Sequence, residues 1–479
     1  MLSDGQAVSY GELWRKAQQL ARTLTARGVR DGDRVAFLGR RSAHDFTFIL
    51  GIWLAGGAYV ALNHKFPAER CRAILADARV RAVVVGPHSI DFGQEILETS
   101  TAFHVAEAEA IVYPYEAESD FAGPADLAYV MFTSGSTGKP KGVPITFGNL
   151  EAFVSNIQSQ YPASSSDRMS QLADLSFDAS VQEFAWCWWV GATLCPVPST
   201  AALMWPRYAQ ELAMTVMLIV PSSIVLAARA RLLGANALPH LRLGFLGAEA
   251  VTRDSVRVMR EAAPNAQLVN LWGPTEATVF FTHFPIARDM DLPDVAPIGL
   301  PFPGQQVQVW DENDEPVDEG QPGELMQSGS QVMSGYWRND EANRQRMVQR
   351  DGQTWYRSGD LAVFDLRVGY RYLGRVDRQV KLRGYRVELL ECESAVREAS
   401  GCAQAAVVPV IAQGQVSADA LACFVVEPKI PLDSLAAMLK ARLPEYMVPA
   451  KFIVLEQLPL GVTGKTDYKA LEAMLRAGA

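Results

Sequence analysis

The chain has 479 residues, and this length predicts two or more domains, because a single hydrophobic core rarely serves so long a chain. Hydrophobic residues make up 49% of the sequence and charged residues 20%, which is typical of globular proteins. The formal net charge of -9 argues against nucleic acid as a general partner, because such a partner requires a basic face that neutralises phosphates.

Helical and strand patterns alternate through the first three quarters of the chain. The amphipathic segment GELWRKAQQLARTLTARGV (residues 11–29) precedes the apolar run RVAFLGR (residues 34–40). In the same way, CRAILADARV (residues 71–80) precedes RAVVVG (residues 81–86). This alternation predicts an α/β protein whose layers contain largely parallel sheets.

An apolar segment, FTFILGIWLAGGAYVAL (residues 46–62), approaches the ~20 residues that a membrane span needs. Gly56 and Gly57 interrupt it, and AYVAL has the composition of a strand. We therefore expect a buried helix followed by a buried strand, and no membrane association. The polar N-terminus lacks a signal-peptide pattern, so we expect a cytoplasmic protein.

A loop rich in glycine and hydroxyl groups, TSGSTGKPKG (residues 133–142), follows the strand pattern LAYVMF. Its glycines permit positive-φ backbone and close approach to a ligand, and its N–H groups and lysines can bind an anion. It is not a Walker A loop, because Thr133 and Pro140 stand where that motif needs Gly and Ser or Thr. We also find no GxGxxG dinucleotide fingerprint.

After about Leu292 the sequence becomes rich in Gly, Pro and turn residues between short strand patterns, which predicts a β subdomain. The polar segment RVDRQ (residues 375–379) is the expected joint to a small domain of roughly a hundred residues. We therefore predict an N-terminal core over residues 1–376 and a C-terminal domain over residues 377–479.

Cysteine and histidine patterns give no support to a zinc site, because the sequence has neither a CxxC pair nor an HExxH motif. Free thiols stay reduced in the cytosol, and lone cysteines are usually buried. We expect buried free thiols at all six positions: Cys71, Cys187, Cys195, Cys392, Cys402 and Cys423.

Motifs spread over nearly the whole chain accompany the glycine-rich loop FTSGSTGKPKG. They are VSYGELWRKAQQLA (from Val8), WLAGGAYVAL (Trp53), LSFDASVQEF (Leu175), NLWGPTEATV (Asn270), YRSGDLA (Tyr356), GRVDRQVKLRGYRVEL (Gly374), LPEYMVP (Leu443) and GKTDYKAL (Gly464). With these motifs in this order, the sequence resembles the ANL superfamily of adenylate-forming enzymes, and the amino-acid-activating branch of nonribosomal peptide synthetases matches best. That branch includes stand-alone enzymes similar to D-alanine–carrier protein ligases.

The resemblance implies a large core of layered α/β subdomains and a small, mobile α+β C-terminal domain. It also implies two half-reactions. The carboxylate of a substrate amino acid attacks the α-phosphate of ATP, and a phosphopantetheine thiol then displaces AMP. No carrier motif is present in the sequence, so the expected thiol donor is a separate carrier protein.

In the nucleotide site that the resemblance implies, Trp272 stacks on adenine, Asn270 meets the adenine edge and Asp360 accepts the ribose hydroxyls. The residues expected at ATP are Thr133, Ser134, Gly135, Ser136, Thr137, Gly138, Lys139, Lys141, Gly247, Ala248, Glu249, Asn270, Leu271, Trp272, Gly273, Asp360, Arg375 and Lys381.

The implied catalytic residues are Thr275, Glu276 and Lys465. Thr275 would touch the α-phosphate, and Glu276 would bind a Mg²⁺ ion that bridges the ATP phosphates. Lys465 would contact the carboxylate and the bridging oxygen, where its charge stabilises the transition state. Because Lys465 belongs to the C-terminal domain, it would act only when that domain closes about a hinge at Asp377.

Asp178, in the motif FDAS, is the residue expected to pair with the substrate α-ammonium group. Beyond Asp178 and Lys465 the implied pocket has no charged side chain, which predicts a neutral amino acid, either α or β. Phe245 and Phe280 are expected to limit its size, and Gly247 to leave room. The pocket residues are Asp178, Ala179, Gln182, Ser223, Phe245, Gly247, Leu271, Val279 and Phe280.

Two alternatives stay open at this point. One is an acyl- or aryl-CoA ligase of the same superfamily, and the other is a nucleotide-binding homologue without catalysis. The chain also departs from the family pattern at Asn63–His64 and at Leu390, where glycine is usual. The exchange at Leu390 is expected to alter how the C-terminal domain packs.

Overall fold

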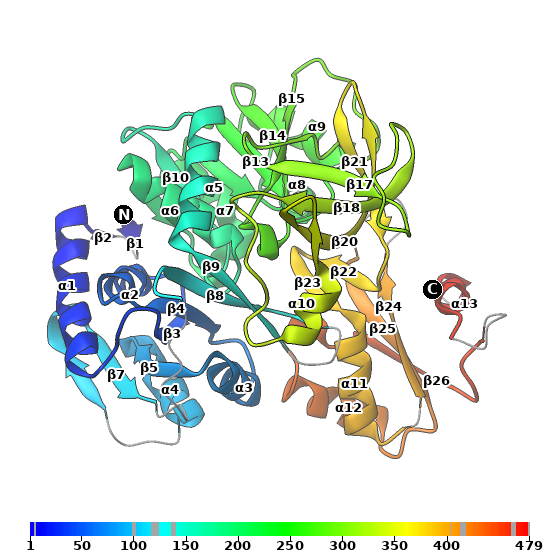
Figure 1. Cartoon of the computed structure of the whole chain (residues 1–479), viewed down its shortest axis with the longest axis horizontal. Helices are drawn as coiled ribbons and strands as arrows, with labels where there is room; N and C mark the ends of the chain where they lie inside the picture. The colour runs from blue at the N-terminus through cyan, green and yellow to red at the C-terminus, as the bar shows by residue number, and fades with distance from the viewer. Residues whose placement is uncertain are drawn as a thin grey trace. The chain divides into compact units, whose positions relative to one another are not determined.

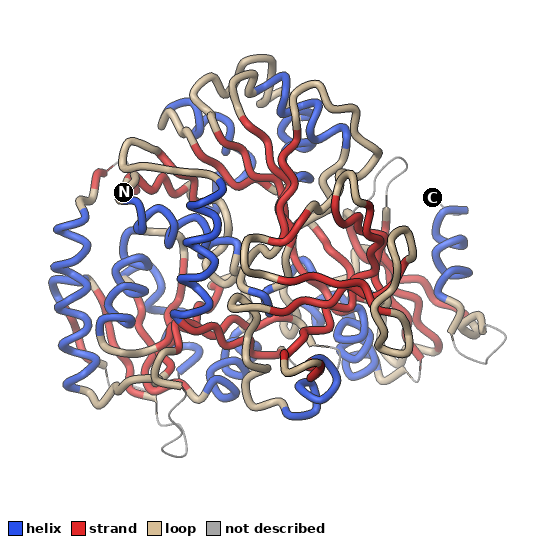
Figure 2. Tube along the Cα trace, turned by 45° about the horizontal axis from the view of Figure 1, so that its top comes forward, coloured by secondary structure: helices blue, strands red, loops and turns tan. Residues whose placement is uncertain are grey.

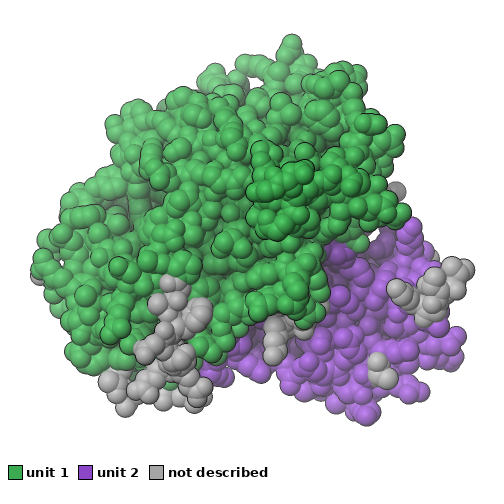
Figure 3. All heavy atoms as spheres, in the orientation of Figure 1, with its two compact units in different colours: residues 1–64, 75–132, 142–376 green, residues 65–74, 133–141, 377–479 purple. Residues whose placement is uncertain are grey.

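The computed structural model describes residues 1–3, 6–97, 102–115, 124–135, 140–402, 404–411, 418–460 and 466–477 (Figure 1). These residues form two compact units, which Figure 3 colours separately. Unit 1 contains residues 1–64, 75–132 and 142–376, and unit 2 contains residues 65–74, 133–141 and 377–479. The functional division predicted between residues 1–376 and residues 377–479 stays a prediction.

The first sheet of unit 1 has the strand order β6-β7-β5-β3-β4-β8-β9, and its central strands β5, β3, β4 and β8 are parallel. The predicted strands RVAFLGR and RAVVVG are β3 and β5, so this part of the α/β prediction is confirmed. The strands of this sheet are β3 (Arg34–Gly39), β4 (Ala58–Asn63), β5 (Val80–Val85), β6 (Phe103–Val105), β7 (Ala110–Pro114), β8 (Leu127–Thr133) and β9 (Lys141–Thr146).

Helices connect and cover these strands (Figure 2), as parallel strands require. The apolar segment of residues 46–62 folds as the buried helix α2 followed by the buried strand β4, which confirms that prediction. None of the helices in the described ranges combines the length and apolar composition that crossing a bilayer demands. The helices around this sheet are α1 (Tyr10–Ala26), α2 (Ala43–Leu54), α3 (Ala68–Ala78), α4 (Ile90–Leu97) and α5 (Phe147–Gln160), with the 3₁₀ turns η1 (Pro87–Ser89) and η2 (Ala106–Ala108).

The second sheet of unit 1 has the order β11-β10-β12-β13-β14-β15-β16; β11 to β14 run parallel to one another, whereas β15 is antiparallel to both β14 and β16. Its strands are β10 (Arg168–Gln171), β11 (Thr193–Pro196), β12 (Val216–Ile219), β13 (Leu243–Gly247), β14 (Gln267–Trp272), β15 (Thr282–Ile286) and β16 (Leu300–Pro301). The connecting helices are α6 (Ala179–Val190), η3 (Ser199–Met204), α7 (Trp205–Glu211), α8 (Pro221–Arg229), α9 (Arg253–Ala262) and η4 (Thr275–Ala277).

The β subdomain predicted after Leu292 is confirmed as a five-stranded antiparallel sheet, with β21 beside β20. A separate two-stranded sheet lies at the N-terminus. These strands and the helix among them are β1 (Leu2–Ser3), β2 (Gln6–Ala7), β17 (Gln306–Trp310), β18 (Pro322–Ser328), α10 (Asp340–Arg346), β19 (Met347–Arg350), β20 (Gln353–Asp365) and β21 (Gly369–Arg375).

One hydrophobic core joins the three large sheets of unit 1. Phe37 of the first sheet, Phe245 of the second and Tyr356 of the third are each fully buried in this same cluster. Burying an aromatic side chain stabilises the fold by about 1.5–3 kcal/mol relative to exposure. The shared core therefore makes a rigid support for the loops at the strand ends.

Unit 2 contains the mixed α+β elements of the C-terminal region. Within this unit Arg70 forms a buried ion pair with Glu391, with Nη1 and Oε1 2.6 Å apart. Leu390 is 40% exposed in the first turn of α11. The elements are β22 (Gln379–Leu382), β23 (Tyr385–Glu388), α11 (Leu389–Ser400), β24 (Gln404–Val410), β25 (Ala420–Val426), α12 (Leu432–Lys440), η5 (Glu445–Met447), β26 (Lys451–Leu455) and α13 (Tyr468–Ala477).

The prediction of buried free thiols is confirmed at all six cysteines, which lie in both units. Burial raises the pKa of the Cys195 thiol to about 11. A thiol held neutral in this way is a poor nucleophile, so the cysteines act as small apolar groups in the core.

Candidate active site

The parallel strands of the second sheet end at a common edge, and predicted site residues follow several of them. Ser223 lies in the first turn of α8, directly after β12, and Gly247 ends β13. Leu271 lies opposite Gly247 in the register of β13 with β14. Carboxyl ends of parallel strands are the usual ligand-binding edge of such sheets, so the fold brings these residues together where a site is expected.

At two positions along this edge, Gly247 and Gly273, a side chain would collide with the loop that contains Val279 and Phe280. A Cβ on Gly273 would lie 2.6 Å from the Cα of Phe280, and a Cβ on Gly247 would lie 2.9 Å from the Phe280 ring. The expectation that Gly247 leaves room is therefore wrong on this side, because the Phe280 ring and the Leu271 carbonyl fill the space. The predicted pocket residues Val279 and Phe280 thus close against both strand ends.

Glu276 is fully buried in η4, and its carboxylate is held by a tyrosine. The Tyr336 hydroxyl donates to Glu276 Oε1 at 2.7 Å, and the Tyr356 hydroxyl lies 3.2 Å from that of Tyr336. The Met333 amide donates to the Glu276 carbonyl at 2.9 Å. Both the backbone and the side chain of Glu276 are therefore fixed in orientation.

The chemistry of Glu276 suits a hard cation that takes its other ligands from a substrate. Among the described residues, no group of three or more His, Cys, Asp or Glu side chains is arranged to bind a metal ion. Mg²⁺ commonly binds one or two carboxylates and completes its coordination with substrate phosphates and water. A single carboxylate such as Glu276 fits that mode, and a closed all-protein metal site does not.

Asp178 stands at the start of α6, and its side chain makes no capping hydrogen bond to the first turn in the described chain. It is half-buried and close enough to raise the pKa of both Tyr59 and Tyr129, although burial is the larger cause. One turn further, Gln182 is 2% exposed, and its Oε1 has no hydrogen-bond partner among the described residues. The first turn of α6 therefore combines the half-buried Asp178 carboxylate with the buried Gln182 amide.

The apolar wall of the predicted pocket is backed by aromatic rings. Phe245 is fully buried, and its ring lies 5.3 Å from the Tyr161 ring and 5.8 Å from the Trp186 ring. Tyr161 in turn forms a 2.6 Å hydrogen bond with Nδ1 of His283. Packing on both sides fixes Phe245, so this wall is rigid.

Asp360 and Arg375 face each other on the antiparallel strands β20 and β21. Their Oδ1 and Nη1 atoms are 2.7 Å apart, and both side chains are about nine-tenths buried. Arg375 also donates to the Ser358 carbonyl at 3.2 Å. Asn270, by contrast, donates its amide to the Pro297 carbonyl at 2.7 Å, so that group is engaged by the protein itself.

Several predicted residues belong to unit 2. There, the Thr133 hydroxyl donates to the Lys141 carbonyl at 3.5 Å, and the Ser134 hydroxyl donates to the Arg386 carbonyl at 3.0 Å. Lys381 lies on β22 opposite Arg386 of β23. Asp377 accepts a hydrogen bond from the Gln379 amide at 3.2 Å. Gly135 also belongs to this unit.

Five predicted residues lie outside the described residues, namely Ser136, Thr137, Gly138, Lys139 and Lys465. Gly142, at the end of the glycine-rich loop, requires a correction. It is not among the glycines with positive φ, and a Cβ there would lie 2.9 Å from the Trp337 Cβ. The glycine is needed for close packing against Trp337 rather than for a left-handed backbone.

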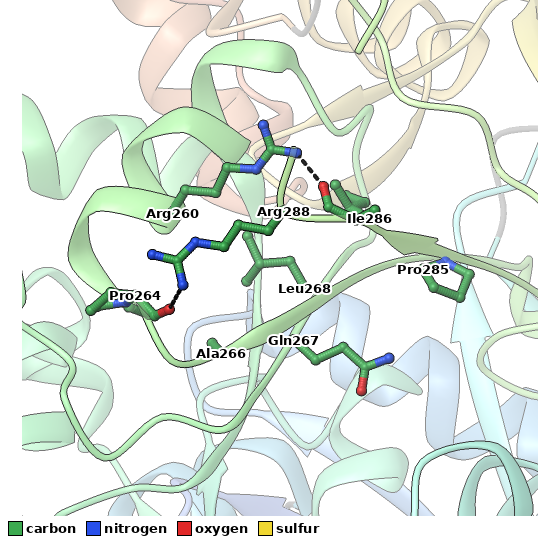
Figure 4. Close-up of a pocket in the computed structure, with 10 residues that line it drawn as sticks. Arg260, Pro264, Ala266, Gln267, Leu268, Pro285, Ile286 and Arg288 are labelled. Carbon is green, nitrogen blue, oxygen red and sulfur yellow. Dashed lines mark hydrogen bonds between the residues drawn. The ribbon is translucent and has the colours of Figure 1, made fainter. Parts of the chain in front are cut away.

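A pocket of about 280 Å³ lies away from this site, at the first residues of β14 and the last residues of β15 (Figure 4). Its two arginines are bound to backbone carbonyls: Arg260 to Met290 at 3.0 Å and Arg288 to Pro264 at 2.9 Å. In the described part of the chain, none of the predicted site residues lines it. This pocket is at the opposite end of β14 from Trp272, so it is not the candidate active site.

Two segments that together make up most of the chain match known protein families. Residues 1–337 match the family described as AMP-binding enzyme. The chain belongs to the AMP-binding enzyme family. Residues 391–465 match the C-terminal domain of the same enzymes. These matches confirm the predicted membership of the ANL superfamily and the predicted α/β fold with a further C-terminal domain.

Relatives of this AMP-binding enzyme include much longer proteins. Tyrocidine synthase 3 of Brevibacillus parabrevis is 34% identical over 98% of this chain, which covers 7% of that protein. Surfactin synthase subunit 2 of Bacillus subtilis (strain 168) is 34% identical over 98% of this chain, which covers 13% of that protein. The chain thus spans about a tenth of the length of these curated relatives.

A solved structure similar to this AMP-binding enzyme is the adenylation domain AlmE of Vibrio cholerae in complex with glycyl-adenosine-5'-phosphate. The two share 29% sequence identity and a TM-score of 0.88, over 99% of this chain and 94% of AlmE. The similarity extends through the whole chain.

Glu183 is a buried acid of this AMP-binding enzyme that the sequence reasoning missed. Its carboxylate accepts hydrogen bonds from Ser170, Gln171, Leu172 and Ala173 at 2.8 to 3.0 Å. Burial raises its pKa to about 8, although these donors favour the charged form. The signal was present, because Glu183 is the only charged residue of α6, a helix composed mainly of apolar residues.

Replacing Glu183 by glutamine is expected to lower the free energy of unfolding by about 3 kcal/mol. The new amide group would point its N–H donors at other donors, and each buried donor left unpaired costs about 1–3 kcal/mol. The loop over residues 172–178, which leads to Asp178, would lose its anchor. Urea denaturation measures the change, and the exposed Glu151 replaced by glutamine is the matched control. An unchanged urea midpoint would contradict the anchoring role.

Proposed function

We propose that this AMP-binding enzyme activates a neutral amino acid with ATP and transfers it as a thioester to a carrier protein. The observation that carries the proposal is Asp178, a half-buried carboxylate at the start of α6, one turn before the buried amide of Gln182. A carboxylate removed from water needs a cationic partner, and the α-ammonium group of an amino acid supplies one. The glycyl adenylate bound by the similar AlmE supports an aminoacyl-adenylate product.

The first half-reaction forms one P–O bond and breaks another. A carboxylate oxygen of the amino acid attacks the α-phosphorus of ATP, the bond to the β-phosphate bridging oxygen breaks, and pyrophosphate leaves. In the second half-reaction a thiolate attacks the carbonyl carbon and AMP leaves. Such reactions depend on positioning and charge stabilisation, which rigid loops at a strand edge provide.

The nucleotide would lie along the ends of β13 and β14, with Asp360 accepting hydrogen bonds from the ribose. Glu276 would hold a Mg²⁺ ion through the carboxylate that Tyr336 orients. That ion would neutralise charge on the phosphates. Thr275 precedes Glu276 in η4 and would touch the α-phosphate, and Lys465, which lies outside the described residues, would supply a cation to the reacting atoms.

The pocket favours a neutral side chain. Phe245, Leu271 and Phe280 are buried and apolar, and no acidic or basic group among the described lining residues matches a charged substrate beyond Asp178. Burying an unpaired charge there would be costly. Transfer to a carrier protein is proposed from the resemblance to the amino-acid-activating branch of nonribosomal peptide synthetases, which the similarity to tyrocidine synthase 3 and surfactin synthase subunit 2 supports.

Amino-acid-dependent exchange of pyrophosphate into ATP tests the proposal, with a panel of neutral, acidic and basic amino acids and of fatty and aryl acids. We expect exchange with one or a few neutral amino acids only. Exchange with fatty or aryl acids alone would contradict it, and a stable CoA thioester in that case would identify an acyl- or aryl-CoA ligase. Loading of a phosphopantetheinylated carrier, followed by intact-mass spectrometry, tests the second half-reaction.

A further inference from the structure

The segment that follows Glu276 has a strained backbone. Thr278 has φ of 56° and Val279 has φ of 70°, in the left-handed region that β-branched residues rarely adopt. Both side chains are at most 2% exposed. Such a conformation persists only where the surroundings enforce it.

The side chain of Gln331 provides that enforcement from a position distant in sequence. Its Nε2 donates to the Phe280 carbonyl at 2.9 Å and to the Ala277 carbonyl at 3.4 Å. Its Oε1 accepts from Asn156 at 2.9 Å. One fully buried amide therefore joins both ends of the segment from 277 to 280.

The backbone around Gln331 holds the same segment. The Thr278 hydroxyl donates to the Gln331 carbonyl at 2.6 Å, and the Gln331 amide donates to Gln305 at 3.1 Å. Two residues further along, Met333 binds the backbone of Glu276. Residues 331–333 thus contact the segment at Glu276, at its middle and at its end.

We propose that Gln331 is a positioning residue that holds Val279 and Phe280 at the amino acid pocket and keeps them in fixed register with Glu276. The inference rests on the proposed function, since it assigns the pocket to an amino acid. The strained segment begins directly after Glu276, the carboxylate expected on the phosphate side. It ends at Val279 and Phe280, which are expected to form a wall of the amino acid pocket. In this role Gln331 sets both the shape of the pocket wall at Val279 and Phe280 and the placement of the Glu276 carboxylate.

A matched control is Gln327, which lies four residues before Gln331, on β18. Gln327 is also fully buried, but neither end of its amide has a hydrogen-bond partner among the described residues. Replacing such a group by an apolar one of similar shape is nearly neutral. Gln331→Met and Gln327→Met therefore remove the same atoms from two buried glutamines, and only the first removes contacts to the segment.

For Gln331→Met we expect the selectivity between the best amino acid and one with a side chain larger by one methylene to fall about 10-fold, because one methylene is worth about 10- to 200-fold in a rigid pocket. The KM for the amino acid should rise by a similar factor, while the KM for ATP stays within about 2-fold of its original value. Gln327→Met should change neither. Equal changes in both KM values, with selectivity retained, would overturn the proposal.

Thr278→Gly should restore selectivity to the Gln331→Met enzyme, which would not be expected if Gln331 only stabilised the fold. Glycine adopts φ near 56° without strain, so the segment needs less enforcement. In the Gln331→Met background, Thr278→Gly should restore at least about 3-fold of the lost selectivity. The melting temperature of the double variant should be compared with that of Gln331→Met. If the double variant is at least as stable and its selectivity does not recover, the result contradicts the proposal.

Hydrogen exchange separates failure of this inference from failure of the proposed function. If the unmodified enzyme exchanges no pyrophosphate with any amino acid, the proposed function fails, and the amides of residues 276–281 still report on Gln331. We expect them to exchange at least about 10-fold faster in Gln331→Met than in Gln327→Met, with the remaining amides of the second sheet unchanged. Equal protection in the two variants would overturn the positioning role.

Discussion

Replacing Glu276 by glutamine is expected to lower the rate of amino-acid-dependent pyrophosphate exchange about 100-fold or more, since it removes the charge proposed to hold the metal ion at the phosphates. The fold should persist, because the glutamine oxygen can accept the 2.7 Å hydrogen bond from Tyr336. The rate of exchange is measured across a Mg²⁺ titration, and the half-saturating Mg²⁺ concentration should rise as well.

Glu312, which is exposed, provides the control for the loss of one negative charge, and its replacement by glutamine should leave the exchange rate unchanged. Tyr336→Phe separates orientation from charge. Tyr336→Phe keeps the Glu276 carboxylate and removes the hydroxyl that donates a hydrogen bond to it. We therefore expect a smaller loss of exchange rate, of about 10-fold, as is typical when a residue that hydrogen-bonds to a metal ligand is replaced. If the Glu276→Gln enzyme exchanged pyrophosphate at the original rate, Glu276 would have no role in the reaction.

Much of the fold could be read from the sequence because buried parallel strands are apolar on both faces. RVAFLGR shows this, since every residue of β3 is buried. The helix and strand within residues 46–62 were predicted for the same reason, as the two glycines mark the turn between them. Local composition therefore located the elements of the first sheet.

Contacts between residues distant in sequence could not be predicted in this way. No periodicity indicates that residues 65–74 and 133–141 belong to the same compact unit as residues 377–479. The need for glycine at Gly142 depends on Trp337, nearly two hundred residues away, and the filling of the space beside Gly247 depends on Phe280. These features arise from packing, to which a sequence motif gives no direct access.

In the candidate site, too, some residues could be predicted from sequence motifs and others could not. The resemblance located residues that would meet a ligand, such as Asp178 and Asp360, because their chemistry recurs in motifs. Glu183 and Gln331 were missed, since each bonds mainly to the backbone of this chain. Such residues become visible only when the loops they hold are in place.

Asp178→Asn is expected to lower kcat/KM for the amino acid substrate about 100-fold. Removing one partner of a desolvated charge pair costs about 2–5 kcal/mol, and each 1.4 kcal/mol is a factor of ten. The loss should fall mainly on KM for the amino acid, because the α-ammonium group is bound in the ground state as well as in the transition state. Steady-state pyrophosphate exchange at saturating ATP measures it.

The decisive comparison uses the des-amino analogue, the same carboxylic acid without its α-amino group. Asp178→Asn should not weaken binding of the analogue and should favour it, because the analogue has no ammonium group for the original carboxylate to bind. Asp174→Asn is the matched control, since Asp174 lies in the same loop and accepts hydrogen bonds from Ser176 at 2.7 and 3.0 Å. Asparagine can keep those bonds, so selectivity should be unchanged. Equal losses for the amino acid and its analogue in Asp178→Asn would mean that this carboxylate supports the loop and does not recognise an ammonium group.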